Sequence, residues 1–288
     1  MGSSQLRFRS VFVELATILG TIQSTLTNFR YLTKEWQKNA EEERLLGVSL
    51  TGILDNELMA TPSDELKELL IEIKDVAIQT NRKWAKLLGI QESAAITCVK
   101  PSGTVSQLVD SASGIHPRHS KYYIRTVRSD NKDPLCVLMK ELGFPHEPDV
   151  TKPEHTTVFS FPVRSPSHAV FREQLSAIQH LELWLFYKKY WAEHTVSITI
   201  SVKENEWLDV AAYVYKHFDH ISGISFLPFS DHVYKQAPYQ ECGFNEFQEL
   251  VSKMPKDVNW TKLSQYEKED STTSSKELSC SSGNCEVV

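Results

Sequence analysis

The sequence has little of what marks membrane, nucleic-acid or metal-binding proteins. It holds no apolar run near the roughly 18 residues of a membrane-spanning helix, and Glu14 interrupts the first apolar stretch, which reads poorly as a signal peptide. The 288 residues carry a net charge of −6 without a dense Lys/Arg run. This charge pattern argues against a nucleic-acid or membrane-surface binder, although a small anion remains a possible ligand. The histidines do not stand at zinc-ligand spacing with cysteines, so we expect no metal site.

Cysteine is scarce, but two of the five cysteines stand close together near the C-terminus. None precedes Cys98, and without a secretory signal the chain is expected to be cytoplasmic, where thiols stay reduced. Cys280 and Cys285 lie in a Ser/Thr-rich, acidic segment that has too few apolar residues to offset the entropy of ordering. We therefore expect a flexible tail over 264–288. Its cysteines are either a dithiol that carries electrons or incidental residues of a disordered terminus.

The rest of the chain reads as an α/β protein of one large domain or two small ones. Apolar spacing predicts helices at 11–32, 34–46 and 61–89, the last with Thr61 as its N-cap and Pro62 at the first helical position. Strands are expected at 95–99, 122–127, 156–161, 195–202 and 221–227, with further helices at 134–142, 169–191 and 204–218. This alternation favours crossover connections and a largely parallel sheet or part of a barrel.

The strongest local chemistry lies in the loop that follows the first expected strand. Residues 94–106 read Ala-Ala-Ile-Thr-Cys-Val-Lys-Pro-Ser-Gly-Thr-Val-Ser. Gly103 permits close backbone approach, and the hydroxyl groups and backbone N–H groups around it suit a phosphate. The same Pro-Ser-Gly-Thr sequence is also an ordinary turn, and the missing Gly-x-x-x-x-Gly-Lys pattern rules out a Walker loop.

Several separate segments resemble those of one enzyme family and occur in the same order. They are residues 45–53, 97–106, 113–125, 193–197, 223–228 and 234–241, and the terminal Cys-x-x-x-x-Cys. From about Leu15 onward the chain resembles the catalytic subunit of class II, adenosylcobalamin-dependent ribonucleotide reductase. The single-chain branch that reduces ribonucleoside triphosphates is the most similar.

The resemblance implies a fold and a reaction. The fold is α/β, the second half of the ten-stranded barrel of these reductases, followed by the flexible tail. The segments would be a helical part at 1–94, an α/β half-barrel with the phosphate loop at 95–263, and a redox-active tail at 264–288. Members of the family use adenosylcobalamin to generate a thiyl radical, abstract the 3′ hydrogen of the substrate and replace its 2′ hydroxyl while a cysteine pair is oxidised.

The resemblance also implies roles for particular residues. The substrate phosphates would lie against Ser102, Gly103, Thr104, Val105 and Ser106. Cys280 and Cys285 would pass electrons from a thioredoxin-type protein to the active-site disulfide. His116 and Arg118 either line the pocket or belong to a structural loop. The implied partners are a ribonucleoside triphosphate, the thioredoxin-type reductant and the upstream half of the enzyme.

The sequence also departs from the family. The Asn-Pro-Cys-Gly-Glu loop that carries the radical cysteine does not occur in the 288 residues. We therefore interpret the chain as the C-terminal part of a longer enzyme. The alternatives are a non-catalytic remnant that binds nucleotides or a partner, and a different α/β enzyme with a redox tail. Cys98 and Cys136 are expected to be packed in the interior, and Cys242 to be exposed in a polar loop.

Overall fold

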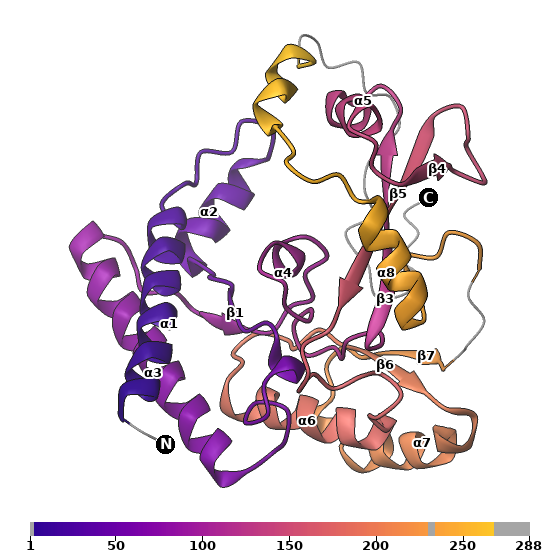
Figure 1. Ribbon diagram of the computed structural model, residues 1–288. Coiled ribbons are helices and arrows are strands. Elements are labelled where there is room, and N and C mark those ends of the chain that lie inside the picture. Colours follow the sequence, from indigo (N-terminus) through magenta and orange to yellow (C-terminus); the bar gives the residue numbers. More distant parts are fainter. Residues whose placement is uncertain (1–2, 230–233, 268–288) are drawn as a thin grey trace. The chain divides into compact units, whose positions relative to one another are not determined.

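The computed structural model describes residues 3–229 and 234–267 (Figure 1). The chain divides into two compact units. Unit 1 comprises Met1–Pro117 and Leu175–Pro228. Unit 2 comprises Arg118–Gln174 and Phe229–Val288. Within the described residues, no helix is long and apolar enough to cross a membrane.

The strands of unit 1 pair in parallel. They are β1 (Val48–Ser49), β2 (Thr97–Cys98), β6 (Thr199–Val202) and β7 (Ser225–Pro228). β1 pairs with β2 and β6 pairs with β7, both in parallel. A parallel bridge between Val99 and Val196 joins the two pairs, and the Ser197 N–H donates to the Val99 carbonyl at 3.0 Å. The parallel arrangement expected from the sequence is therefore confirmed for this unit.

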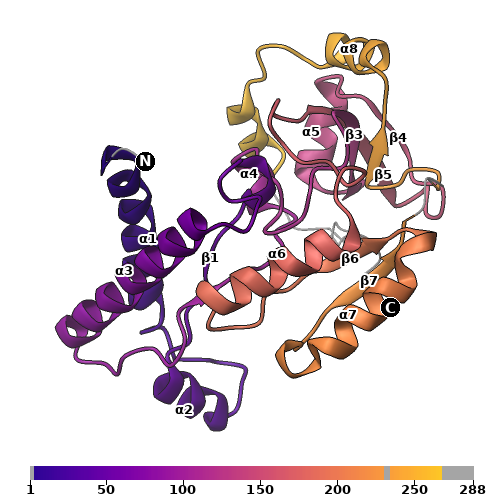
Figure 2. The same cartoon turned by 90° about the horizontal axis from the view of Figure 1, so that it is seen from below.

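The helices of unit 1 pack on one another in series. The α-helices are α1 (Ser3–Gln23), α2 (Lys34–Glu43), α3 (Asp64–Leu88), α4 (Val105–Leu108), α6 (Ala177–Tyr190) and α7 (Trp207–Lys216), and the short 3₁₀ turns are η1 (Ile53–Asp55), η2 (Glu204–Glu206) and η3 (Phe218–His220). α1 packs on α3, α3 on α6, and α6 on α7. Figures 1 and 2 both show α1 and α3 side by side. Such a layer of helices over parallel strands is the usual α/β arrangement.

The start of α3 corrects the sequence interpretation. The helix begins at Asp64, and its N-cap is Ser63, whose hydroxyl accepts from the Leu66 N–H at 3.1 Å. The prediction of Thr61 as the cap was therefore wrong. Serine can cap the helix from the extended backbone that the structure gives Ser63, and Pro62 then precedes the cap. The apolar stripe itself is confirmed, since Leu66, Leu69, Leu70 and Ile73 are buried.

Two tryptophans fasten α6 to the strands of unit 1. Trp184 donates from Nε1 to the Val196 carbonyl at 2.9 Å, and Trp191 donates to the Cys98 carbonyl at 2.7 Å. Both indoles are fully buried, so each satisfies its single polar group while filling the core. α6 begins at Ala177 rather than near 169, because Ser176 and Gln179 form a capping box.

Unit 2 contains an antiparallel sheet of four strands in the order β4-β5-β3-β8. Its elements are β3 (Tyr122–Asp130), α5 (Pro134–Glu141), β4 (His146–Pro148), β5 (Thr156–Arg164), β8 (Tyr239–Glu241), α8 (Phe244–Lys253) and η4 (Trp260–Gln265). The expectation of a largely parallel sheet was therefore wrong for this part of the chain. α5 had the pattern of a crossover helix, but β4 follows it and leads β5 back antiparallel to β3.

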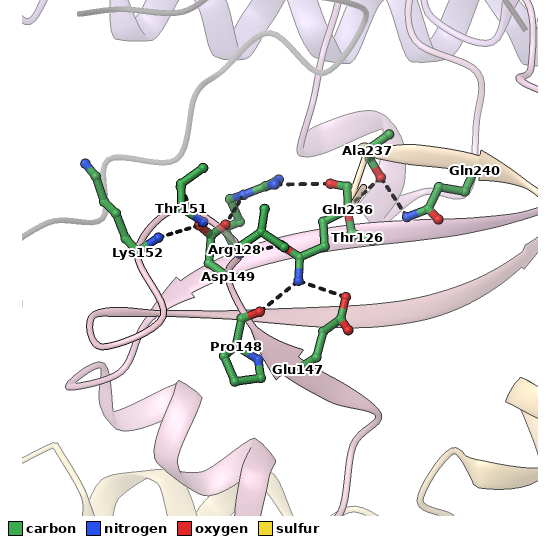
Figure 3. Close-up of polar contacts among 11 residues, drawn as sticks. Thr126, Arg128, Glu147, Pro148, Asp149, Thr151, Lys152, Gln236, Ala237 and Gln240 are labelled. Carbon is green, nitrogen blue, oxygen red and sulfur yellow. Dashed lines mark hydrogen bonds and ion pairs between the residues drawn. The ribbon is translucent and has the colours of Figure 1, made fainter. Parts of the chain in front are cut away.

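A polar network in unit 2 holds the segment before β8 against β3 and β4 (Figure 3). Gln236, which is buried and has a φ of +62°, donates from Nε2 to the Glu147 carboxylate and the Pro148 carbonyl, both at 2.8 Å. Arg128 donates to the Gln236 carbonyl at 3.1 Å and forms an ion pair with Asp149 at 2.8 Å. The network explains why residues 236–238 adopt a fixed path, including a left-handed backbone at a residue that is not glycine.

Asp149 makes this network sensitive to acid. Burial alone would raise the pKa of its carboxyl, but hydrogen bonds from Thr151, the Lys152 N–H and Arg128 lower that pKa to about 2. A depressed pKa contributes stability above the unfolded value near 4 that is lost as the pH falls towards 2.

We expect Asp149→Asn to lower the free energy of unfolding by about 2 kcal/mol at pH 7. The deficit should shrink as the pH falls from 5 to 2, and urea unfolding at several pH values measures it. Glu92→Gln is the control, because the Arg82–Glu92 pair is exposed on both sides. An equal loss of stability at pH 7 and pH 2.5 would contradict this role of Asp149.

Candidate functional site

The carboxyl ends of β1 and β2 meet the segment that precedes β6 around Lys100. The Lys100 backbone N–H donates at 3.0 Å to the Oγ of Ser49, the last residue of β1. Its Nζ donates to Ser197 Oγ, just before β6, at 2.9 Å. The carboxyl ends of parallel strands, here those of β1 and β2, are where α/β proteins commonly bind ligands, because loops from several strands converge there.

The loop expected to bind phosphate follows directly. The Ser102 N–H donates to Ser113 Oγ at 2.7 Å, and the Ser106 N–H donates to Ser102 Oγ at 3.1 Å. The Ser106 hydroxyl donates to the Ser102 carbonyl and is buried. Ser102 and Ser106 therefore shape the loop with their side chains. The Thr104 side chain forms no hydrogen bond with any described residue, and Val105 is exposed in the first turn of α4.

Gly114 packs directly against the backbone of Lys100, just before this loop. Its φ is +56°, and a Cβ added there would lie 2.8 Å from the Lys100 carbonyl oxygen. The Gly114 N–H donates to Thr51 Oγ1, which in turn donates to the Ala112 carbonyl, each at 3.0 Å. Only glycine fits a position that needs both a left-handed backbone and this close approach. The segment at 112–114 and the segment at 51–55 thus fix the path of the chain at Lys100.

His116 has a structural position within unit 1. The Thr199 N–H donates to His116 Nε2 at 3.0 Å, so Nδ1 carries the proton and donates to the Ser113 carbonyl at 3.0 Å. Burial lowers the pKa of His116, which keeps the ring neutral. Both ring nitrogens are used in joining residues 113–116 to the start of β6. The geometry therefore supports the structural-loop reading of this histidine.

Arg118 is the first residue of unit 2. Its side chain is buried, and Nη1 lies 3.5 Å from the Tyr123 hydroxyl on β3. Its backbone N–H donates to the Val170 carbonyl at 3.0 Å. These contacts place Arg118 in the interior of its own unit, and its role in a pocket stays a prediction.

The described cysteines are packed rather than reactive. Cys98 is buried in β2, and burial raises the pKa of its thiol; Cys136 is fully buried in α5. Cys242 is also buried, and burial followed by Glu246 and Glu241 raises its pKa. The expectation of an exposed Cys242 was wrong, because its N–H bonds to the Tyr122 carbonyl and draws it against β3. Cys280 and Cys285 lie outside the described residues.

Sequence reasoning missed several residues that build the loop. Ser49, Thr51, Lys100, Ser113 and Ser197 make its supporting hydrogen bonds. A signal was available, since polar residues that follow short buried strands tend to gather at one edge of a sheet. All of them also fall within the segments 45–53, 97–106, 113–125 and 193–197.

Curated proteins similar to this chain share one description. A relative from Euglena gracilis, an adenosylcobalamin-dependent ribonucleoside-triphosphate reductase, is 30% identical over 233 residues, which are 79% of this chain and 32% of the relative. A probable enzyme of the same description from Dictyostelium discoideum is 29% identical over 85% of this chain. This chain is a homologue of the adenosylcobalamin-dependent ribonucleotide reductases.

The fold agrees with this homology. A crystal structure of a B12-dependent, class II ribonucleotide reductase matches with a TM-score of 0.76 at 21% identity, covering 88% of this chain and 39% of that one. A scan against protein-family models found no match. The resemblance to class II reductases noted from the sequence motifs is thus confirmed. The chain spans about one third of the length of its reductase relatives in Euglena and Dictyostelium.

Proposed function

We propose that this chain is the C-terminal part of a ribonucleoside-triphosphate reductase, which converts ribonucleotides to deoxyribonucleotides by thiyl-radical chemistry. In that enzyme it would form the second half of the ten-stranded barrel. The observation that carries the proposal is the convergence of four family-like segments around Lys100, at the carboxyl ends of β1 and β2. The reductase homologues supply the reaction class.

The loop at 102–106 is proposed to receive the substrate phosphates. Ser102 and Ser106 hold its shape, while Thr104 offers its hydroxyl to the ligand. The Lys100 ammonium, positioned by Ser197, adds positive charge at the same sheet edge. Hydroxyl donors and a cation suit a polyphosphate, because hydrogen bonds to a charged group are stronger than neutral ones.

The cofactor of the homologues is adenosylcobalamin, which supplies radical chemistry when bound. The described residues do not complete a site for that chemistry. Cys98, Cys136 and Cys242 are buried, and burial raises the pKa of Cys98 and Cys242. The radical cysteine is therefore assigned to the upstream half of the enzyme.

Electron supply is proposed to fall to Cys280 and Cys285. In this step a thiolate of the pair attacks the active-site disulfide, which releases one active-site cysteine as a thiolate and leaves the other in a mixed disulfide with the pair. The second thiolate of the pair then attacks its partner's sulfur in that mixed disulfide and displaces the other active-site cysteine. The pair becomes a disulfide, and a thioredoxin-type dithiol then reduces it by the same exchange. Each exchange moves two electrons, first from the pair to the active-site disulfide and then from the thioredoxin-type dithiol to the pair.

Reconstitution tests the proposal. The chain would be assayed with adenosylcobalamin, thioredoxin and ribonucleoside triphosphates, alone and with the separately expressed upstream two thirds of the Euglena reductase. We expect deoxynucleotides only from the mixture, because the 288 residues lack the Asn-Pro-Cys-Gly-Glu loop. Deoxynucleotide formation by the chain alone would refute the interpretation as a part of the enzyme.

The non-catalytic remnant remains the second candidate, favoured by the burial of all three described cysteines. It predicts a mixture that binds ribonucleoside triphosphates but forms no deoxynucleotide. Both candidates predict triphosphate binding in calorimetric titration of that mixture, so deoxynucleotide formation separates them.

A further inference from the structure

Unit 1 contains a pocket away from the strand ends. It lies against α2 and the segment that joins α1 to α2, and has a volume of 520 Å³. This is the size of pockets that hold small organic molecules. Its apolar wall includes Leu26, Phe29 and Trp36, and its polar groups include Glu35, Glu43 and Arg44. None of these residues belongs to the phosphate loop or to the segments that support it.

The pocket walls are held in place by hydrogen bonds. Thr27 Oγ1 donates to the Glu41 carboxylate at 2.8 Å, which ties the joining segment to α2. Arg44 Nη1 donates to the Ser24 carbonyl at 2.5 Å, which ties the end of α2 to the end of α1. A site whose walls are already joined loses little conformational freedom when a ligand enters.

Two aromatic side chains line this pocket and remain accessible. Trp36 is 61% exposed and Phe29 is 36% exposed. Aromatic faces of this kind stack on planar heterocycles, and such stacking tolerates any base. The apolar wall therefore selects a flat ring without choosing which one.

The polar groups of the pocket determine which heterocycle it selects. Glu35 and Glu43 only accept hydrogen bonds when ionised, so their partner on the ligand must donate. A hydrogen bond from Thr33 lowers the pKa of Glu35 and favours its ionised form. Arg44 only donates, and its buried Nε forms no hydrogen bond with any described residue. Nη1 is taken by Ser24, so Nη2 is the donor left for a ligand acceptor.

Guanine meets these demands best among the common bases. It places the acceptors O6 and N7, which arginine recognises, beside the donors N1–H and N2–H₂, which a carboxylate recognises. The surroundings are acidic, since α2 carries Glu35, Glu41, Glu42 and Glu43 against Lys34 and Lys38. Negative charge at this density disfavours a phosphate tail. We propose that this pocket binds a guanine base as an uncharged nucleoside.

Titration of the full chain with guanosine tests the proposal, with tryptophan fluorescence and saturation-transfer NMR as readouts. We expect saturable binding of guanosine that is about tenfold tighter than that of adenosine or GTP. Arg44→Gln and Trp36→Ala should each weaken guanosine binding about tenfold. Lys38→Gln is the matched control on α2, because Lys38 pairs with Glu42 on the exposed side, and its affinity should match the parent chain.

Other results would overturn the guanine site. They are no saturable signal with guanosine, equal affinity for adenosine, or unchanged guanosine affinity in both the Arg44 and the Trp36 variants. If Arg44→Gln fails to fold by circular dichroism, Trp36→Ala is read alone, and unchanged guanosine affinity in that variant overturns the site. Trp36→Phe keeps an aromatic face and should retain binding. It removes the one tryptophan that lines the pocket, so NMR reports binding in this variant. None of these outcomes depends on reductase activity, so the site stands or falls separately from the proposed function.

Discussion

Replacing Cys280 or Cys285 with serine is expected to abolish thioredoxin-driven turnover of the reconstituted reductase. A single remaining thiol can open the active-site disulfide, but it then stalls as a mixed disulfide because no second thiol resolves it. The loss should be complete for either variant, and the double variant should be no worse. Deoxynucleotide formation with thioredoxin, thioredoxin reductase and NADPH measures it.

A small dithiol separates electron supply from catalysis in the same experiment. Dithiothreitol can reduce the active-site disulfide directly, so it should restore turnover in both serine variants. Ser282→Ala, between the two cysteines in the sequence, is the matched control and should turn over normally with either reductant. Undiminished thioredoxin-driven turnover of both cysteine variants would remove the electron-relay role from this pair.

Gly114→Ala is expected to be the most damaging single change near the phosphate loop. The added methyl would lie 2.8 Å from the Lys100 carbonyl, and the backbone φ of +56° adds strain. Because the clash is with backbone, the chain at Lys100 must move, and the loop moves with it. We expect a loss of about 3 kcal/mol in the free energy of unfolding. Triphosphate affinity of the reconstituted enzyme should fall about tenfold or more.

Gly89→Ala separates the effect of the positive φ from the effect of the clash with the backbone. Gly89 ends α3 with a φ of +66°, but a Cβ there would meet nothing within 4 Å. This control should lose roughly 1 kcal/mol of stability from backbone strain alone and keep its nucleotide affinity. Urea unfolding gives the stabilities and calorimetry gives the affinities. Equal stability losses in the two variants would show that the close approach at Lys100 has no energetic importance.

The sequence predicted most of the elements because their apolar patterns are local. The stripe from Leu66 to Ala77 is buried as its spacing required, and the segments at 122–127 and 156–161 are strands. Local pattern could not fix how those two strands pair. An α5 pattern between β3 and β5 fits a parallel crossover as well as the observed antiparallel return through β4.

The position of the candidate site was predictable from the sequence, but the role of each hydroxyl group in it was not. Hydroxyl residues after a buried strand pointed to the loop at 102–106, yet Ser106 is buried and bonds to Ser102. Which hydroxyl faces the loop and which faces solvent depends on contacts with Ser113, eleven residues further along the chain. Likewise, Cys242 follows a glutamate and looks polar, but its pairing with Tyr122 buries it.

The interleaving of the two units has a consequence for synthesis. Unit 1 needs residues up to Pro228, and its first stretch ends at Pro117. At ribosomal rates of about 5–20 residues per second, the first stretch waits roughly 6–22 s for β6 and β7 to emerge. Until then Val99, which follows β2 and forms the bridge with Val196, has no bridge partner from its own unit. A nascent chain of this design has good reason to engage a chaperone before residue 228 leaves the ribosome.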